Sequence, residues 1–134
     1  MREIKFRAWD EETKQLLIVN SLTLDFGLCD LWNGKPEDEG VAKKLSDVNL
    51  MQYTGLKDKN GVEIYDGDVI TYQEGPPKMR AKVVWKNGGF VFAYEDGIEN
   101  ITSESWYAPM DVEITEVIGN IYQNPELLTW KYYK

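Results

Sequence analysis

The sequence predicts a small, mainly β protein with low helix content. Short runs of apolar and aromatic residues recur along the chain, and several alternate with polar residues as half-buried strands do. Glycine-containing turn sequences separate these runs, whereas apolar residues at helical spacing are scarce. The chain has 134 residues, which suits one hydrophobic core, since single cores commonly hold about 100–150 residues.

Residues 1–49 are predicted to form an N-terminal appendage that contains a β-hairpin. Residues 2–9 alternate between apolar and polar side chains, and a polar turn separates them from a second apolar run at residues 15–20. Residues 21–32 are apolar but follow no clean period, so no element is predicted there. At most two helical turns are expected in residues 41–48, whose apolar side chains have helical spacing.

Residues 50–128 are predicted to form the core of the fold, and two hairpins begin it. The first joins the apolar run Leu50–Thr54 to a strand at Gly67–Tyr72, through a turn at Asp58–Gly61 whose Asn-Gly pair tolerates a positive φ. The second joins strands at Lys78–Lys86 and Phe90–Glu95 through a turn at Asn87–Gly89.

The C-terminal part of this core is predicted to hold two more strands and a helical turn. Asp111–Glu116 alternates, Val117–Tyr122 reads as a last strand, and Asn124–Leu128 resembles a capped turn with proline at its first position. Taken with the two hairpins, this order of elements suits an SH3-like small β-barrel.

The composition excludes several classes of enzyme. The chain contains no histidine and one cysteine, Cys29. Ser-His-Asp and Cys-His mechanisms and histidine-based zinc sites are therefore impossible, and Cys29 has no partner for an internal disulfide. No catalytic signature or cofactor motif is present, so we expect a noncatalytic protein without a cofactor or a bound metal.

The sequence also bears on location. The N-terminus mixes charges of both signs with isolated apolar residues, which is unlike the apolar segment of a signal peptide. No uncharged apolar run approaches the roughly 20 residues that a membrane-spanning helix needs. We therefore expect a soluble, cytoplasmic protein that does not bind a membrane.

Negative charge is concentrated in one region. The formal net charge is -8, and residues 88–129, here called the acidic region, contain no Lys or Arg. Eight acids lie in this region, so it accounts for the whole net charge. Such a surface should attract a basic partner and repel phosphate, with an effect that salt weakens. A solvated face that only keeps the protein soluble is the alternative.

Three strings of the sequence resemble the YopX family of bacteriophage and prophage proteins. They are residues 4–10 (IKFRAWD), residues 50–68 with LMQYTGLKDKNG followed by EIYDGD, and residues 117–128 (VIGNIYQNPELL). The resemblance spans the chain, so residues 1–134 are expected to form one YopX-like domain. It implies a mainly β, SH3-like fold and a place inside an infected or lysogenic bacterium, and it brings no catalytic residue, substrate or cofactor.

The leading hypothesis is a phage accessory protein that binds a host or phage protein through the acidic region. The candidate contacts combine acids with aromatic side chains that are expected in a turn-rich, partly exposed stretch. They are Glu95, Asp96, Trp106, Tyr107, Glu113 and Glu116. The sequence does not identify the partner, and self-association remains open.

Two alternatives use other residues. The strand at residues 78–86 carries basic side chains on one face and could bind nucleic acid, through Lys78, Arg80, Lys82 and Lys86. Asp66 and Asp68 could instead hold a divalent cation for an enzyme, because residues two apart on a strand share a face. Turn and strand-entry chemistry, with a carboxylate accepting backbone N–H groups, is the simpler interpretation of both aspartates.

Overall fold

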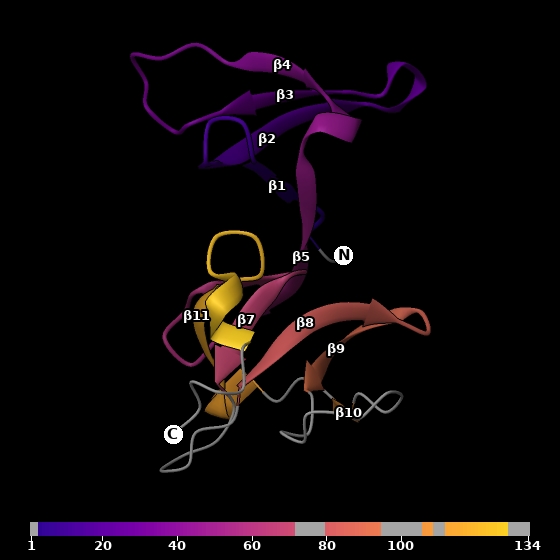
Figure 1. The fold of residues 1–134 in the computed structure, drawn as a ribbon, viewed down its shortest axis with the longest axis vertical. Helices are drawn as coiled ribbons and strands as arrows, with labels where there is room; N and C mark the ends of the chain where they lie inside the picture. Colours follow the sequence, from indigo (N-terminus) through magenta and orange to yellow (C-terminus); the bar gives the residue numbers. More distant parts are fainter. Residues whose placement is uncertain (1–2, 72–79, 95–105, 109–111, 129–134) are drawn as a thin grey trace. The chain divides into compact units, whose positions relative to one another are not determined.

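The computed structural model of the protein describes residues 3–71, 80–94, 106–108 and 112–128 (Figure 1). Helix within these ranges is confined to short 3-10 turns, η1 (Leu24–Phe26), η2 (Leu45–Asp47), η3 (Val112–Ile114) and η4 (Pro125–Leu128). None of them has the length and hydropathy that crossing a membrane would require. The described strands are β1 (Phe6–Asp10), β2 (Gln15–Thr23), β3 (Leu28–Trp32), β4 (Val41–Lys44), β5 (Asn49–Lys57), β6 (Glu63–Tyr65), β7 (Asp68–Thr71), β8 (Arg80–Lys86), β9 (Gly89–Tyr94), β10 (Trp106–Ala108) and β11 (Glu116–Asn120). The prediction of a mainly β fold with low helix content is confirmed.

The strands form two antiparallel sheets. Their orders are β4-β3-β2-β1-β5-β6 and β10-β9-β8-β7-β11. Neither sheet closes into a barrel within the described strands, so the SH3-like arrangement, although compatible, stays a prediction. The chain divides into two compact units, Met1–Tyr53 and Thr54–Lys134, and β5 spans the division.

The N-terminal unit contains the expected hairpin. β1 and β2 pair antiparallel from Arg7 opposite Ile18 to Asp10 opposite Gln15. Ala8 and Trp9 are both buried although they are adjacent in the strand, so β1 is covered on both faces. The core of the unit is built from Ala8, Leu17, Cys29, Leu31 and Val48.

Two further strands extend this sheet, and one of them corrects an expectation. β2 pairs with β3 through a register shift between Val19 and Ser21, and β3 pairs with β4. The expectation of helical turns in residues 41–48 is wrong for Val41–Lys44, because their backbone pairs with β3. Only Leu45–Asp47 forms a 3-10 turn.

The first predicted hairpin is wrong in its second strand, because β5 pairs with β6 and β7 belongs to the other sheet. The second predicted hairpin is present in the C-terminal unit. Asn87 and Gly88, which link β8 to β9, both have positive φ, at 52° and 84°. Two positive φ values in a two-residue turn match the right-handed twist of the flanking strands. Along β8, Ala81 and Val83 are fully buried, and they pack with Ile64, Ile70 and Phe92 in the core of this unit.

The end of the described chain differs in one respect from the sequence prediction. The expected strand at Asp111–Glu116 is wrong, because Val112–Ile114 forms a 3-10 turn and β11 begins at Glu116. The N–H of Thr115 bonds to the carbonyl of Val112 at 3.4 Å, which ends this turn before the strand starts. The predicted helical turn after proline is confirmed as η4.

Candidate functional site

The most contacted polar side chain of the β5–β6 loop belongs to Asp58. Its Oδ1 accepts the N–H groups of Asn60 at 2.8 Å and Val62 at 2.9 Å, and its Oδ2 accepts that of Val117 at 2.9 Å. Burial alone raises the pKa of this carboxyl, but the three N–H donors outweigh burial and lower the pKa overall. Asp58 thus ties the loop to the start of β11.

The neighbouring residue strengthens the same junction. The N–H of Lys59 donates to the carbonyl of Thr115 at 3.0 Å, and the Lys59 ammonium lies 3.8 Å from a carboxylate oxygen of Glu116. Together these contacts cover the outer edge of β11 where it begins, which removes backbone groups that another strand could pair with. Glu116, a predicted partner contact, is therefore partly balanced by a cation within the protein.

Asp66 and Asp68, the predicted metal candidates, have different surroundings. Asp68 is fully buried, and its Oδ2 accepts the N–H of Tyr65 at 2.8 Å. Asp66 is half-buried; burial raises its pKa, and the Gly67 N–H offsets this only in part. Within the described ranges, no group of three or more Cys, Asp or Glu side chains is placed as metal ligands would be. For Asp68 the strand-entry interpretation is confirmed.

The predicted contacts of the acidic region are only partly described. Glu95 and Asp96 lie outside the described residues. Trp106 and Tyr107 belong to the short strand β10, whose backbone pairs with β9, and their expected role as an exposed contact stays a prediction. Glu113 is exposed in η3. Of the acids in this set, the structure therefore describes Glu113 as exposed and Glu116 as half-buried.

The predicted basic stripe of β8 runs along a face that is largely covered. Lys78 lies outside the described residues, and Lys86 is exposed at the hairpin end. Lys82 is opposite Val69 on one side and Ala93 on the other, and both neighbours are buried. Directly opposite residues share a face of the sheet, so this face is not an open, solvated surface.

The turn η4 is part of what covers that face. A guanidinium nitrogen of Arg80 donates to the carbonyl of Leu127 at 3.2 Å. A Cβ atom built on Gly119, opposite Val69 in β11, would lie 2.5 Å from Oδ1 of Asn124 and 2.7 Å from Cδ1 of Leu127. Arg80 therefore anchors η4 to β8 through this hydrogen bond. Among the predicted bases that the structure describes, Arg80 and Lys82 are not part of an open row of cations.

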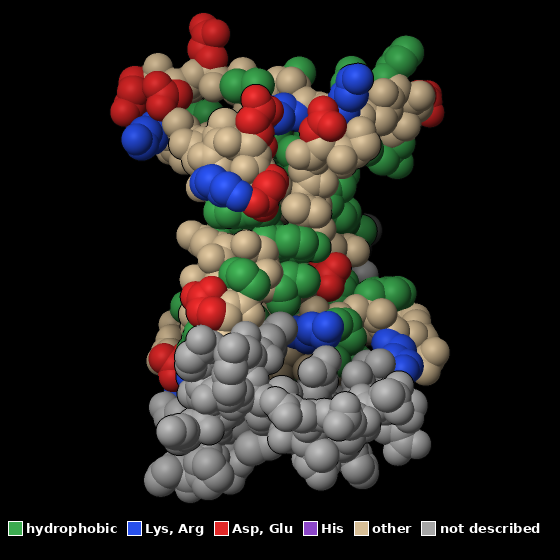
Figure 2. Space-filling model, viewed as in Figure 1, with side chains coloured by type: hydrophobic (Ala, Val, Ile, Leu, Met, Phe, Trp, Pro, Cys, Tyr) green, Lys and Arg blue, Asp and Glu red, His purple; other side chains and the backbone are tan. Residues whose placement is uncertain are grey.

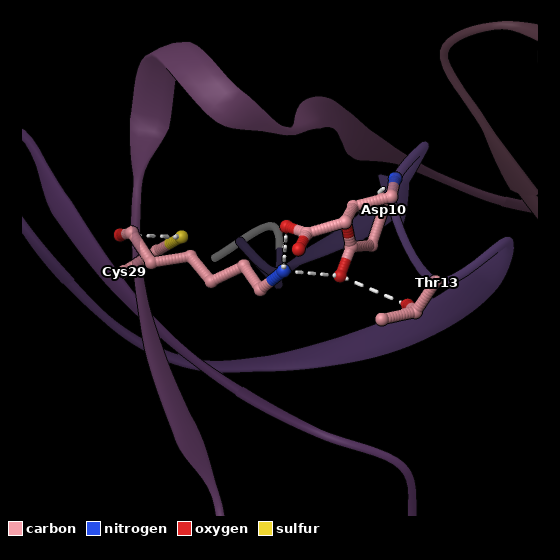
Figure 3. Close-up of polar contacts among 5 residues, drawn as sticks. Asp10, Thr13 and Cys29 are labelled. Atoms are coloured by element: carbon pink, nitrogen blue, oxygen red, sulfur yellow. Dashed lines mark hydrogen bonds and ion pairs between the residues drawn. The ribbon is translucent and has the colours of Figure 1, made fainter.

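An ionic cluster in the N-terminal unit was not predicted from the sequence (Figure 3). The ammonium of Lys43 on β4 lies 2.7 Å from Oδ2 of Asp10 and 3.1 Å from a carboxylate oxygen of Glu12. Asp10 also accepts bonds from the Thr13 hydroxyl and the Glu12 N–H. Burial alone raises the pKa of Asp10, yet these bonds lower it overall, while the bonds to Asp10 and Glu12 raise the pKa of Lys43.

Cys29, which lies beside this cluster, is buried and contacts the backbone. The Cys29 thiol is buried and lies 3.5 Å from the carbonyl oxygen of Lys43 (Figure 3). Burial is the largest cause of its raised pKa, so the thiol stays protonated at neutral pH. Cys29 is therefore a small residue of the hydrophobic core of this unit.

Several large apolar side chains are exposed in the N-terminal unit. The two most exposed of them lie at the end of the β2–β3 hairpin, where Leu24 is 74% exposed and Phe26 is 78% exposed. Figure 2 shows hydrophobic side chains at that end of the unit, at the upper right of the view. One feature of the sequence indicated these exposed side chains, namely an apolar run in residues 21–32 without the period of a helix or a strand.

Comparison with known proteins decides the family. A family model described as YopX protein matches residues 5–129, which is nearly the whole chain. The chain belongs to the YopX family. Its fold is similar to the crystal structure of protein EF1440 from Enterococcus faecalis, with a TM-score of 0.63 and 29% sequence identity, over 96% of this chain and 99% of that one. No curated protein matches the chain.

The strings that carry the YopX resemblance have a structural role in this chain. Each contains a buried polar residue that binds the backbone of a turn or strand. Asp10, Asp58 and Asp68 do so as described above, and Asn120 Oδ1 accepts the N–H groups of Tyr122 at 3.1 Å and Gln123 at 2.8 Å. These residues therefore specify turns and strand starts in the fold of this chain.

Proposed function

We propose that this YopX-family chain is a noncatalytic bacteriophage or prophage accessory protein that binds a basic partner protein through the acidic region. The observation that carries the proposal is the uneven charge, because residues 88–129 contain eight acids and no Lys or Arg. Charge of one sign on one region steers the encounter with a partner of opposite sign.

The structure supports a surface role in two ways. Glu113 is exposed in a short turn. The recognisable polar motifs, in contrast, are occupied by backbone contacts, as the three N–H donors of Asp58 show. A catalytic group has to be able to reach a substrate, and these buried carboxylates are committed to the fold instead.

The mechanism of binding is surface complementarity. Acidic side chains attract Lys and Arg of the partner from a distance, and apolar contacts at the centre of the interface hold the complex. The partner would be a host or phage protein in the bacterial cytoplasm. Binding should weaken as salt rises, because exposed charges farther apart than about 8 Å are screened at physiological ionic strength.

Affinity capture tests this proposal. The tagged full chain is incubated with bacterial lysate at low and moderate salt, with and without nuclease, and retained proteins are identified by mass spectrometry. The expected result is a nuclease-resistant basic protein that is lost at moderate salt. Capture that nuclease abolishes would contradict the proposal in favour of nucleic acid, and the absence of any specifically retained protein would contradict it outright.

A further inference from the structure

The end of the β2–β3 hairpin presents apolar side chains that the fold does not use. η1 joins the two strands, and none of its residues is buried. Leu24 and Phe26 are 74% and 78% exposed, the highest values among the large hydrophobic side chains of the described residues. Exposing two large apolar side chains together has an unfavourable hydration cost, and grouped exposure of this kind marks interaction surfaces.

The backbone beneath these side chains is fixed by hydrogen bonds. Gly27 follows the turn in the left-handed conformation, with φ of 62°, and its N–H bonds to the carbonyl of Leu24 at 3.2 Å. Its own carbonyl accepts the N–H of Leu45 from η2 at 2.8 Å. Residues 24–26, here called the apolar tip, are therefore held in place by η2 of the same unit. This restraint lowers the conformational entropy that the tip would lose on binding.

Charge on the tip distinguishes between possible occupants. Asp25 lies between Leu24 and Phe26 and is exposed, and Asp47 is exposed in the turn that braces the tip. Lys44, opposite Leu28 at the base of the tip, is the exposed cation closest to it in the strand register. Inserting the tip into lipid would place the Asp25 carboxylate in an apolar medium, which is strongly unfavourable. A protein pocket with a cation at its rim would pair with that carboxylate instead.

We propose that Leu24 and Phe26 form a second contact with the basic partner protein and insert into an apolar pocket that has Lys or Arg at its rim, facing Asp25. This inference rests on the proposed function, because it gives the same partner an apolar contact in addition to the acidic one. The acidic region then governs the rate of encounter, and the tip slows dissociation.

Site-specific photo-crosslinking tests the inference. A diazirine-bearing aliphatic residue replaces Leu24 in the tagged full chain, and the control carries the same residue at Val41, which is 54% exposed in the same unit. Both are irradiated in bacterial lysate, and crosslinked peptides are mapped by mass spectrometry. We expect one discrete protein from position 24, at a peptide with apolar residues beside Lys or Arg, and at least a tenfold lower yield from position 41.

Two variants make the result decisive. Phe26→Ser should reduce the yield from position 24 at least tenfold without lowering the melting temperature, because its side chain is exposed. Glu113→Lys should slow capture at low salt but leave the crosslinked peptide unchanged. An unchanged yield in Phe26→Ser would overturn the inference, as would crosslinks only to lipid, to a second copy or to nothing.

The two proposals fail separately in this experiment. If capture depends on Glu113 but position 24 gives no partner crosslink, the apolar contact is wrong and the acidic one stands. If position 24 crosslinks a protein whose capture is indifferent to reversal of Glu113 and the other acids of the acidic region, the acidic contact is wrong and the tip stands.

Discussion

The carboxylate of Asp58 accepts the backbone N–H of Val117 at 2.9 Å, although the two residues lie 59 positions apart. This bond joins the loop after β5 to the strand that ends the second sheet. The same carboxylate also closes its own loop, through the N–H groups of Asn60 and Val62. Asp58 therefore stabilises a local turn and a long-range junction at once.

Replacing Asp58 should destabilise the protein substantially. Asp58→Ala leaves three backbone N–H groups without their acceptor, and we expect a loss of about 1–3 kcal/mol in the free energy of unfolding. The free energy of unfolding of Asp58→Asn, which keeps one oxygen acceptor, should lie between that of Asp58→Ala and that of the wild type. Urea denaturation measures both, and Asp25→Ala, an exposed aspartate, is the control. Equal stability of Asp58→Ala and the control would contradict the role of this junction.

Stability should fall at acid pH. The pKa values of Asp10 and Asp58 are lower in the folded protein than their ordinary value, so the folded state binds fewer protons than the unfolded state. Their contribution is present above the ordinary pKa of about 4 and is lost as pH falls through the folded values. Asp66, whose pKa is raised, acts in the opposite direction. Urea denaturation between about pH 2 and pH 6 should show a net loss that is smaller in Asp58→Asn. A profile identical in the variant and the wild type would refute this assignment.

The Asp10–Lys43 ion pair should be energetically coupled. Lys43→Gln leaves the buried Asp10 carboxylate with only the Thr13 hydroxyl and the Glu12 N–H, so the pKa of Asp10 should rise and the protein should lose stability. A double-mutant cycle with Asp10→Asn should give a non-zero coupling energy in chemical denaturation. Lys14→Gln removes the exposed bond to Glu11 and is the matched control, for which little change is expected. Strictly additive effects of the Asp10 and Lys43 variants would argue against the pair.

Gly119 should tolerate no side chain. A Cβ atom there would lie 2.5 Å from the Asn124 side chain and 2.7 Å from that of Leu127, so Gly119→Ala has to displace η4. Overpacking of this kind costs about 1–3 kcal/mol. Gly89→Ala is the control, because a Cβ at Gly89 would meet no atom within 4 Å. Thermal denaturation compares the two, and a Gly119→Ala variant as stable as Gly89→Ala would show that η4 does not pack where it is described.

Local patterns predicted local structure well. The Asn87–Gly88 turn and the strands on either side follow from residues that are adjacent in sequence, and both were found as expected. The pairing of β2 with β3 was missed because a register shift between Val19 and Ser21 breaks the alternation on which the prediction depends. The helical turns expected in residues 41–48 failed for another reason. Backbone pairing of Val41–Lys44 with β3 overrides the weak helical preference of these residues.

The candidate sites could be predicted only in part, because their contacts link distant segments. Asp68 was anticipated as a strand-entry carboxylate, since that role needs only the adjacent turn. The Asp10–Lys43 pair joins β1 to β4, and the bond of Arg80 to Leu127 joins β8 to η4. No spacing in the sequence specifies such pairings, which arise when strands take their places in a sheet.

Charge reversal in the acidic region tests the proposed function most directly. One variant carries Glu95→Lys, Asp96→Lys and Glu113→Lys, and its control carries Glu3→Lys, Glu37→Lys and Glu39→Lys, so the net charge of the two is identical. The measurement is retention of the basic partner protein on each tagged chain at low salt after nuclease treatment. We expect retention to fall at least tenfold in the first variant and to stay near the wild-type level in the control. Equal retention by both variants would contradict binding through the acidic region.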